Sequence, residues 1–236
     1  MTQTATPHVA LTHSSAPTKK RVKASSSVTQ PNSRSKSTTS DKSAAPVESS
    51  SKTSSREKRS SSKLNAMLGN EDLHNELHQV SQRGSEIIDA ICNDYDLPLG
   101  VIAPCNSTHP LFGSVPDEVY KLSTLNNTLL MLMNAGKFHK EITNLSYKNG
   151  HLLFGSSANI SLTGTKFCVE DMQSEILEIA DIVIDYGLMK YNLYGQSSTL
   201  LNVETLEVFR EGVCYENIGH ILKKHFSITL PPRQNS

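Results

Sequence analysis

Apolar side chains are scarce in the first quarter of the chain. From Met1 to about Ser62 the residues are mostly Ser, Thr, Lys, Ala and Pro. After Met1 the only aliphatic side chains larger than Ala in this segment are Val9, Leu11, Val22, Val28 and Val47. Such a segment cannot bury enough apolar surface to offset the entropy of ordering it, about 1–2 kcal/mol per residue. We therefore expect residues 1–63 to form a disordered tail rich in Ser and Lys, and residues 64–236 to fold as one domain.

Two short amphipathic helices are predicted where order begins, near Leu64. Asn70 is a typical helix cap, and apolar residues follow it at helical spacing: Leu73, Leu77 and Val80. Ser85 is predicted to cap the second helix, whose apolar residues are Ile87, Ile88 and Ile91. On the first helix His74 and His78 lie four positions apart, so both rings could reach one metal ion, but the sequence suggests no third ligand. We expect surface histidines there rather than a metal site.

Longer apolar runs predict strands that alternate with helices. Leu97–Ala103, broken by Pro98 and Gly100, is typical of a buried strand that enters a loop. Thr128–Met133 predicts a second strand, followed by a turn of small residues and then a helix. The apolar positions of that helix are Phe138, Ile142 and Leu145.

The alternation continues to the end of the chain. Leu152–Phe154 is apolar, and Gly155–Gly164 is a loop of small polar residues. The next helix presents Val169, Met172, Ile176 and Ile179 on one face. Asp181–Gly187 predicts a further buried strand, Thr199–Val203 and Leu206–Phe209 predict a hairpin, and a last helix carries Ile218, Ile221 and Leu222. The pattern is that of an α/β domain with a mixed sheet and flanking helices.

Charge divides the chain in two. Residues 1–63 hold 12 Lys and Arg against 3 Asp and Glu, whereas residues 64–236 hold 11 against 20. The tail is therefore basic and the domain acidic, so any contact with nucleic acid is expected to come from the tail.

The cysteines predict neither a zinc site nor a redox pair. Cys92, Cys105, Cys168 and Cys214 form no C-x-x-C pair and have no His at metal-ligand spacing, so we expect buried, reduced thiols. No apolar run is long enough to span a bilayer, and the N-terminus lacks the apolar core of a secretory signal. We expect a soluble cytoplasmic protein without a membrane partner. A mitochondrial transit peptide is the alternative, since the tail is poor in acidic residues.

The loop Gly155–Gly164 carries the strongest chemical signal. It follows an apolar strand and supplies unshielded backbone N–H groups and short hydroxyl and amide donors, which suit a phosphate or a carboxylate. From the residues alone, a polar turn with helix caps explains the composition equally well.

The phrase S-S-A-N-I-S-L-T-G in this loop resembles the S-A-N-x-S-G loop of the YrdC family, the fold of threonylcarbamoyl-AMP synthases. It is followed at the family's spacing by a helix, by D-I-V-I-D-Y-G (Asp181–Gly187), by S-S-T (Ser197–Thr199) and by R-E-G (Arg210–Gly212). The resemblance covers roughly Leu97 to Pro232. It implies a partial YrdC-like twisted mixed sheet, with the N-terminal half of the family's domain missing.

The resemblance also implies an activity and a site. Family members condense L-threonine, bicarbonate and ATP, with Mg²⁺, to threonylcarbamoyl-AMP, the intermediate for threonylcarbamoyladenosine in tRNA. By match, substrate and nucleotide would be bound by Ser156, Ser157, Asn159, Ser198, Thr199 and Arg210. Arg210 would offer a planar cation to the phosphate or ribose, with a strand-end surface arginine as the alternative. Gly212 would let the backbone turn close by.

Two departures from the family affect the expected activity. No K-x-R in an apolar framework is found beside the domain, where Arg56, Lys58, Arg59 and Lys63 are the basic residues. Leu132 and Asn134 stand roughly where many members have R-x-P. Cations that stabilise charge on phosphorus are worth several kcal/mol, so their loss would cripple transfer. Two hypotheses follow: a nucleotidyltransferase whose other half is encoded upstream or supplied by another chain, or a non-catalytic module that binds a nucleotide, double-stranded RNA or tRNA.

Overall fold

The computed structural model describes residues 65–160, 163–192 and 195–233, together with the backbone of residues 20–23. The described residues form two compact units. The smaller unit lies within Met1–Ser26 and Ala158–Met189, and the larger one within Ser27–Ser157 and Lys190–Ser236. The expected boundary between tail and domain, at residues 63 and 64, lies outside the described residues.

The larger unit is built on a seven-stranded mixed sheet. Its strands are β2 (Ala66–Leu68), β3 (Leu99–Pro104), β4 (Thr124–Leu125), β5 (Thr128–Met133), β6 (Phe154–Gly155), β8 (Leu200–Asn202) and β9 (Val208–Arg210). The order across the sheet is β6-β2-β5-β3-β8-β9, and β4 pairs with the first residues of β5. The β2–β5 and β3–β8 pairs are parallel and the other pairs are antiparallel. The expected mixed α/β sheet is confirmed, as is the β8–β9 hairpin.

The two central strands explain why the apolar runs form the core. β3 and β5 pair along their whole length, with Val101 opposite Met131. Both of these side chains are fully buried, and Leu99 and Leu129 are buried as completely. A strand that is covered on both faces has a continuous run of apolar residues. This is why the sequence pattern alone predicted β3 and β5.

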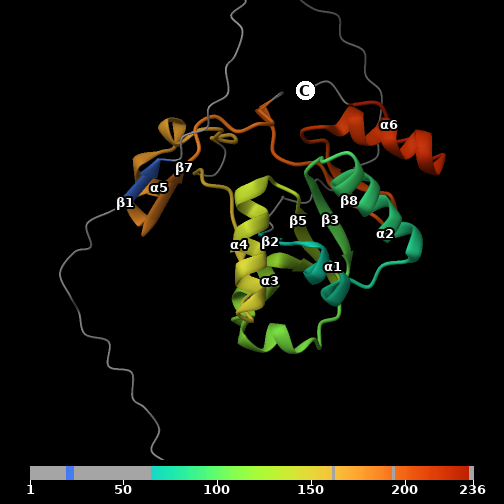
Figure 1. Cartoon of the computed structure of the whole chain (residues 1–236), viewed down its shortest axis with the longest axis horizontal. Coiled ribbons are helices and arrows are strands. Elements are labelled where there is room, and N and C mark those ends of the chain that lie inside the picture. The colour runs from blue at the N-terminus through green and yellow to red at the C-terminus, as the bar shows by residue number, and fades with distance from the viewer. Residues whose placement is uncertain (1–19, 24–64, 161–162, 193–194, 234–236) are drawn as a thin grey trace, which may run out of the picture. The chain divides into compact units, whose positions relative to one another are not determined.

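Helices flank this sheet. They are α1 (Glu71–Leu77), α2 (Gln82–Asp89), α3 (Asp117–Ser123), α4 (Lys137–Lys148) and α6 (Tyr215–Phe226), with a π-turn at Ala90–Asp94 and a 3₁₀ turn at Pro110–Ser114. Figure 1 shows α4 on the β2 side of the sheet and α2 and α6 on the β8 side. The expected last helix is confirmed: Ile218, Ile221 and Leu222 of α6 are buried in the core. No helix in the described ranges is long and apolar enough to cross a membrane.

Of the two predicted helix caps, one is confirmed and one is wrong. Asn70 caps α1 as expected, and its Oδ1 accepts a hydrogen bond from the Leu73 amide at 2.8 Å. The prediction that Ser85 caps α2 is wrong, because the helix starts earlier and Ser81 is its cap. A carboxylate far along the chain holds Ser81 in the cap position. Glu204 accepts a hydrogen bond from the Ser81 backbone N–H at 2.7 Å, and the same carboxylate lies 3.1 Å from the Ser81 hydroxyl.

The buried face of α4 differs from the predicted one. Phe138 and Leu145 are 40% and 63% exposed, whereas His139 and Thr143 are buried. Asn144 lies on the same side as these two residues, and its Oδ1 accepts a hydrogen bond from Asn70 at 2.7 Å. The helix therefore turns a polar stripe toward α1, which an analysis of apolar spacing does not detect.

The smaller unit corrects two expectations. Strand β7 (Ile182–Asp185), expected to be buried, leaves Ile182 and Ile184 65% and 41% exposed. It pairs in parallel with β1 (Lys20–Lys23) in a two-stranded sheet. The expected disorder is therefore wrong for Lys20–Lys23, because an unpaired strand edge can order a tail segment by backbone hydrogen bonds alone. The rest of the predicted tail lies outside the described residues. This unit also contains the 3₁₀ turn Val169–Asp171 and helix α5 (Ser174–Ile179).

The cysteines follow the expectation in part. All four are free, and Cys92 and Cys105 are buried. Cys168 and Cys214 are half-buried instead, because each lies just before the first residue of a helical element, the 3₁₀ turn Val169–Asp171 and α6, rather than within the core.

Candidate functional site

The loop residues expected to bind nucleotide follow an edge strand. Ser156 and Ser157 come directly after β6 and are exposed. Asn159 is half-buried and belongs to the smaller unit, where its Nδ2 donates to the Ile160 carbonyl at 3.0 Å. Ser161 and Leu162 lie outside the described residues.

The S-S-T and R-E-G phrases pack against each other. The fully buried Thr199 donates from Oγ1 to the Val213 carbonyl at 3.0 Å, and the same oxygen accepts from the Gly212 amide at 3.1 Å. Ser198 and Val213 also form a parallel β-bridge. A Cβ placed on Gly212 would lie 2.1 Å from the Ser197 carbonyl oxygen, so only glycine permits this approach. The close backbone approach expected at Gly212 is present, and its place beside a ligand stays a prediction.

Arg210 holds the same turn from outside. Its Nε and one Nη donate to the Ser198 carbonyl at 2.9 and 2.8 Å, in a fork on one oxygen. Surrounding protein atoms desolvate the guanidinium and lower its pKa. Arg210 lies at the end of β9 and its side chain is partly exposed. The fork fixes the turn, and binding of a phosphate or ribose by Arg210 stays a prediction.

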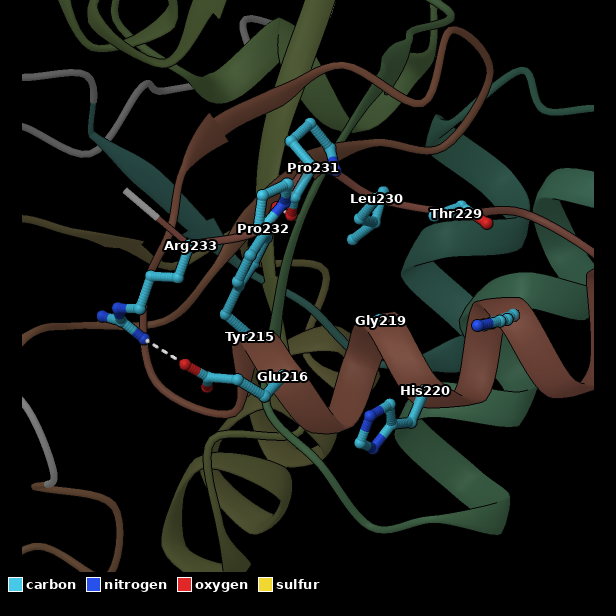
Figure 2. A pocket seen from close by; sticks show the side chains of 10 residues that line it. Tyr215, Glu216, Gly219, His220, Thr229, Leu230, Pro231, Pro232 and Arg233 are labelled. Atoms are coloured by element: carbon cyan, nitrogen blue, oxygen red, sulfur yellow. Dashed lines mark hydrogen bonds and ion pairs between the residues drawn. The ribbon is translucent and has the colours of Figure 1, made fainter. Parts of the chain in front are cut away.

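Arg233 completes this cluster, and sequence reasoning missed it. One Nη lies 3.3 Å from the Gly212 carbonyl, and the other donates to the Glu211 carbonyl at 3.2 Å and to Gln196 Oε1 at 3.0 Å. Its side chain also pairs with Glu216 on α6 at 3.4 Å, as Figure 2 shows. Arg233 follows two prolines and belongs to no recognisable sequence motif. Its contacts with the turn can therefore be found only from the folded structure.

A groove of about 220 Å³ runs between α6 and the segment Thr229–Arg233. Tyr215 spans its end, because its hydroxyl donates to the Pro231 carbonyl at 2.8 Å. In Figure 2 the prolines lie above Tyr215, and Arg233 extends beyond them. These contacts attach the C-terminal segment to α6 and thereby position Arg233 against the R-E-G turn.

The sheet order separates the predicted residues into two groups. Ser198, Thr199 and Arg210 lie together at the β8–β9 edge, whereas Ser156 and Ser157 follow β6 at the opposite edge. Strands lie about 4.8 Å apart, so five spacings separate β6 from β9 by about 24 Å. The described residues thus bring three of the six together.

The expectation of surface histidines on α1 is wrong. His74 and His78 are 3% and 5% exposed, and their Nδ1 atoms lie 2.9 Å apart. Nε2 of His78 lies 3.2 Å from the Leu129 carbonyl oxygen. Burial and the neighbouring His74 lower the pKa of His78 to about 3, and burial lowers that of His74. Spacing alone could not distinguish this pair from a solvent-facing one. In the described part of the chain, no three His, Cys, Asp or Glu side chains gather as a metal site.

Lys19-Lys20-Arg21 is a K-x-R sequence that lies further from the domain along the chain than Arg56, Lys58, Arg59 and Lys63. Lys20 and Arg21 begin strand β1 of the smaller unit.

No family model, curated protein or solved structure matches this chain. The resemblance to the YrdC family therefore depends on the sequence phrases alone.

Proposed function

We propose that this chain is a YrdC-like protein that resembles L-threonylcarbamoyladenylate synthases and binds adenine nucleotide. The observation that carries the proposal is the packing of two of the matched phrases. Ser198 and Arg210, 12 positions apart, share a hydrogen-bonded fork, and Thr199 binds the Gly212 amide. Phrases that resemble one family's site and also contact each other in the fold are consistent with a common function.

In this proposal ATP, with Mg²⁺, is bound at the S-S-T and R-E-G turn, and the Ser-rich loop at the opposite edge of the sheet is not part of the same site. The hydroxyl of Ser198 donates to a phosphate oxygen, and the N–H groups of Arg210 that lie outside the fork supply one cation. L-threonine and bicarbonate are the co-substrates that the resemblance implies. The proposed compartment is the cytoplasm, supported by four free cysteines, with the mitochondrion as the alternative.

We propose further that the chain by itself binds nucleotide better than it turns it over. A triphosphate carries three to four negative charges, and the resemblance supplies one matched cation, Arg210. Charge-assisted hydrogen bonds contribute about 1.5–3 kcal/mol each, so missing partners weaken both affinity and transition-state stabilisation.

Two measurements test this. Calorimetric titration with ATP and Mg²⁺ should detect binding, and Ser198→Ala should weaken it about three- to tenfold. Ser107→Ala, an exposed serine in another loop of the same unit, is the matched control and should not change affinity. Absence of ATP binding would refute the proposed function.

Pyrophosphate release from ATP, L-threonine and bicarbonate should stay at the level of a protein-free blank. Threonine-dependent release would show that the chain completes the reaction alone. In that case a Lys19→Ala, Arg21→Ala double variant would test whether the K-x-R of the tail supplies the second cation.

A second candidate function is a non-catalytic module that binds double-stranded RNA or tRNA. The charge of residues 1–63, with 12 basic and 3 acidic residues, favours it. RNA binding that falls steeply with salt, together with no response to ATP, would support this candidate over the first.

A further inference from the structure

The groove between α6 and the segment Thr229–Arg233, which we name the α6 groove, has the dimensions of a site for a small ligand. Its volume is about 220 Å³. Drug-sized ligands occupy pockets of about 300–1,000 Å³, so the α6 groove suits a smaller molecule. Figure 2 shows the helix on one side and Leu230, Pro231 and Pro232 on the other.

The wall opposite the helix is held in place by the protein's own contacts. Tyr215 donates from its hydroxyl to the Pro231 carbonyl at 2.8 Å, and Arg233 contacts the carbonyls of Gly212 and Glu211 at 3.3 and 3.2 Å. Proline has a fixed φ angle, so the Pro-Pro segment between these contacts has little conformational freedom. The groove is thus formed before a ligand arrives, which lowers the entropic cost of binding.

Gly219 lies in the middle of α6 and lines the groove. Glycine inside a helix costs about 1 kcal/mol relative to alanine. Neither packing nor backbone conformation requires glycine at this position, because an added Cβ would meet no atom within 4 Å and the φ angle is not positive. What the missing side chain provides is open space over bare helix backbone, where a flat group can lie against the proline rings.

The charged side chains give the groove a positive end. Glu216 pairs with Arg233 at 3.4 Å, so these two charges cancel. Lys223 is exposed and has no ion pair in the described part of the chain. It lies seven positions beyond Glu216 on the same helix, about 10 Å along the axis. Residues 64–236 hold 20 acidic and 11 basic residues, so this local positive charge is opposite to that of the domain as a whole.

We propose that the α6 groove binds a small aromatic monocarboxylate, whose ring lies over Gly219 against the two prolines and whose carboxylate faces Lys223. Burial of the ring against apolar walls supplies affinity, and the charge-assisted hydrogen bond from Lys223 orients the ligand. A single negative charge matches the single unpaired cation. The inference goes beyond the proposed nucleotide site and does not depend on it, because it assigns no ligand contact to Ser198, Thr199 or Arg210.

Amide NMR of the full 236-residue chain tests the proposal. Sodium benzoate is titrated to about 50 mM at constant ionic strength, enough to fill a site with a millimolar Kd. The amide signals of Gly219 and His220 should shift and reach saturation. Benzamide has the same ring without the charge, and acetate has the same charge without the ring. Each should therefore bind at least about threefold more weakly than benzoate.

The variant Gly219→Ala separates binding from stability. Its methyl group occupies the space over the helix and should weaken benzoate binding at least about fivefold, although the helix itself becomes more stable. Gly113→Ala is the matched control, because a Cβ on Gly113 also meets no atom within 4 Å and Gly113 does not line the groove. This control should bind benzoate like the unmodified chain.

A second pair of variants tests the role of the charge. Lys223→Gln removes the unpaired cation and should weaken benzoate binding about two- to fivefold, with no effect on benzamide. Lys224→Gln removes the same charge from the next residue of α6, which lies outside the groove and contacts the Tyr95 hydroxyl at 3.4 Å. This second control should leave benzoate affinity unchanged.

The proposal is overturned by any of three results: no saturable shift with benzoate, equal affinity for benzoate and benzamide, or unchanged benzoate binding by Gly219→Ala. Tighter binding of the blocked peptide acetyl-Phe-Asp-amide than of benzoate would assign the groove to a protein partner and is likewise a contrary result. Benzoate binding without ATP binding would refute the nucleotide site alone and leave the carboxylate site supported.

Discussion

Thr199 Oγ1 links the segment before the β8–β9 hairpin to the segment after it. It accepts a hydrogen bond from the Gly212 N–H at 3.1 Å and donates one to the Val213 carbonyl at 3.0 Å. The hydroxyl has no access to solvent, so water cannot replace it. One side chain therefore satisfies two buried backbone groups at the point where the S-S-T and R-E-G phrases meet.

Replacing this hydroxyl with a methyl group should destabilise the protein. Thr199→Val keeps the volume but leaves a buried donor and a buried acceptor unsatisfied, at a cost of about 1–3 kcal/mol. Thr199→Ser retains the hydroxyl and is the control, with an expected loss of less than half as much. Urea denaturation followed by circular dichroism measures both. A stable Thr199→Val variant, together with a larger loss in Thr199→Ser, would show that the methyl group and not the hydroxyl is what matters.

Two glycines in this region should respond to alanine with opposite signs. Gly212→Ala places a Cβ within 2.4 Å of three backbone atoms, which must move, so we expect a loss of at least about 3 kcal/mol. Gly219, within α6, has nothing within 4 Å of the same position. Gly219→Ala should therefore stabilise the protein by about 0.5–1 kcal/mol through helix propensity. Midpoints of chemical denaturation decide the signs.

Local pattern predicted the core elements of the larger unit well, for a physical reason. The apolar runs of β3 and β5 and the stripe Ile218, Ile221 and Leu222 are properties of neighbouring residues, and burial follows from them. The partner of a strand is not a local property. The run Ile182–Asp185 looks like a core strand, yet it pairs with Lys20–Lys23 in the smaller unit and stays largely exposed.

The chemistry was harder to predict than the elements. Thr199 and Gly212 were found because a family phrase contains them. His74 and His139 are buried by the packing of two helices 65 positions apart along the chain, and neither lies in a recognisable phrase. Polar residues are normally expected outside, so a polar buried stripe such as that of α4 is assigned to solvent by any rule based on hydropathy.

Arg233 should contribute more to stability than its place near the C-terminus suggests. Its side chain is only 14% exposed and contacts the carbonyls of Glu211 and Gly212. Arg233→Ala should cost about 1–3 kcal/mol, since these carbonyls lose their donor. Arg83→Ala is the control, because Arg83 is exposed and makes one bond, to the Phe226 carbonyl at 3.2 Å, so its loss should be under about 1 kcal/mol. Thermal denaturation of both variants provides the comparison.

Stability should fall below neutral pH because of the buried histidine pair. The pKa of His78 is about 3 in the folded protein, against about 6.5 in an unfolded chain. Between these values the unfolded state binds more protons, so stability rises with pH across the window. The contribution of neutral His78 is therefore complete above about pH 6.5 and is lost progressively toward about pH 3, with a slope of at most about 1.4 kcal/mol per pH unit.

A variant that cannot titrate isolates this effect from that of the carboxylates. His78→Gln should be less stable than the unmodified protein at pH 7.5, because the contacts to His74 and Leu129 are disturbed, but its stability should change less between pH 6.5 and pH 4.5. His151→Gln, at an exposed position, is the matched control and should keep the full pH dependence. Urea denaturation at several pH values in this range gives the slopes. If His78→Gln and the unmodified chain lose stability in parallel, protonation of His78 is not what destabilises the protein in acid, and the ring is either charged or solvated in the native state.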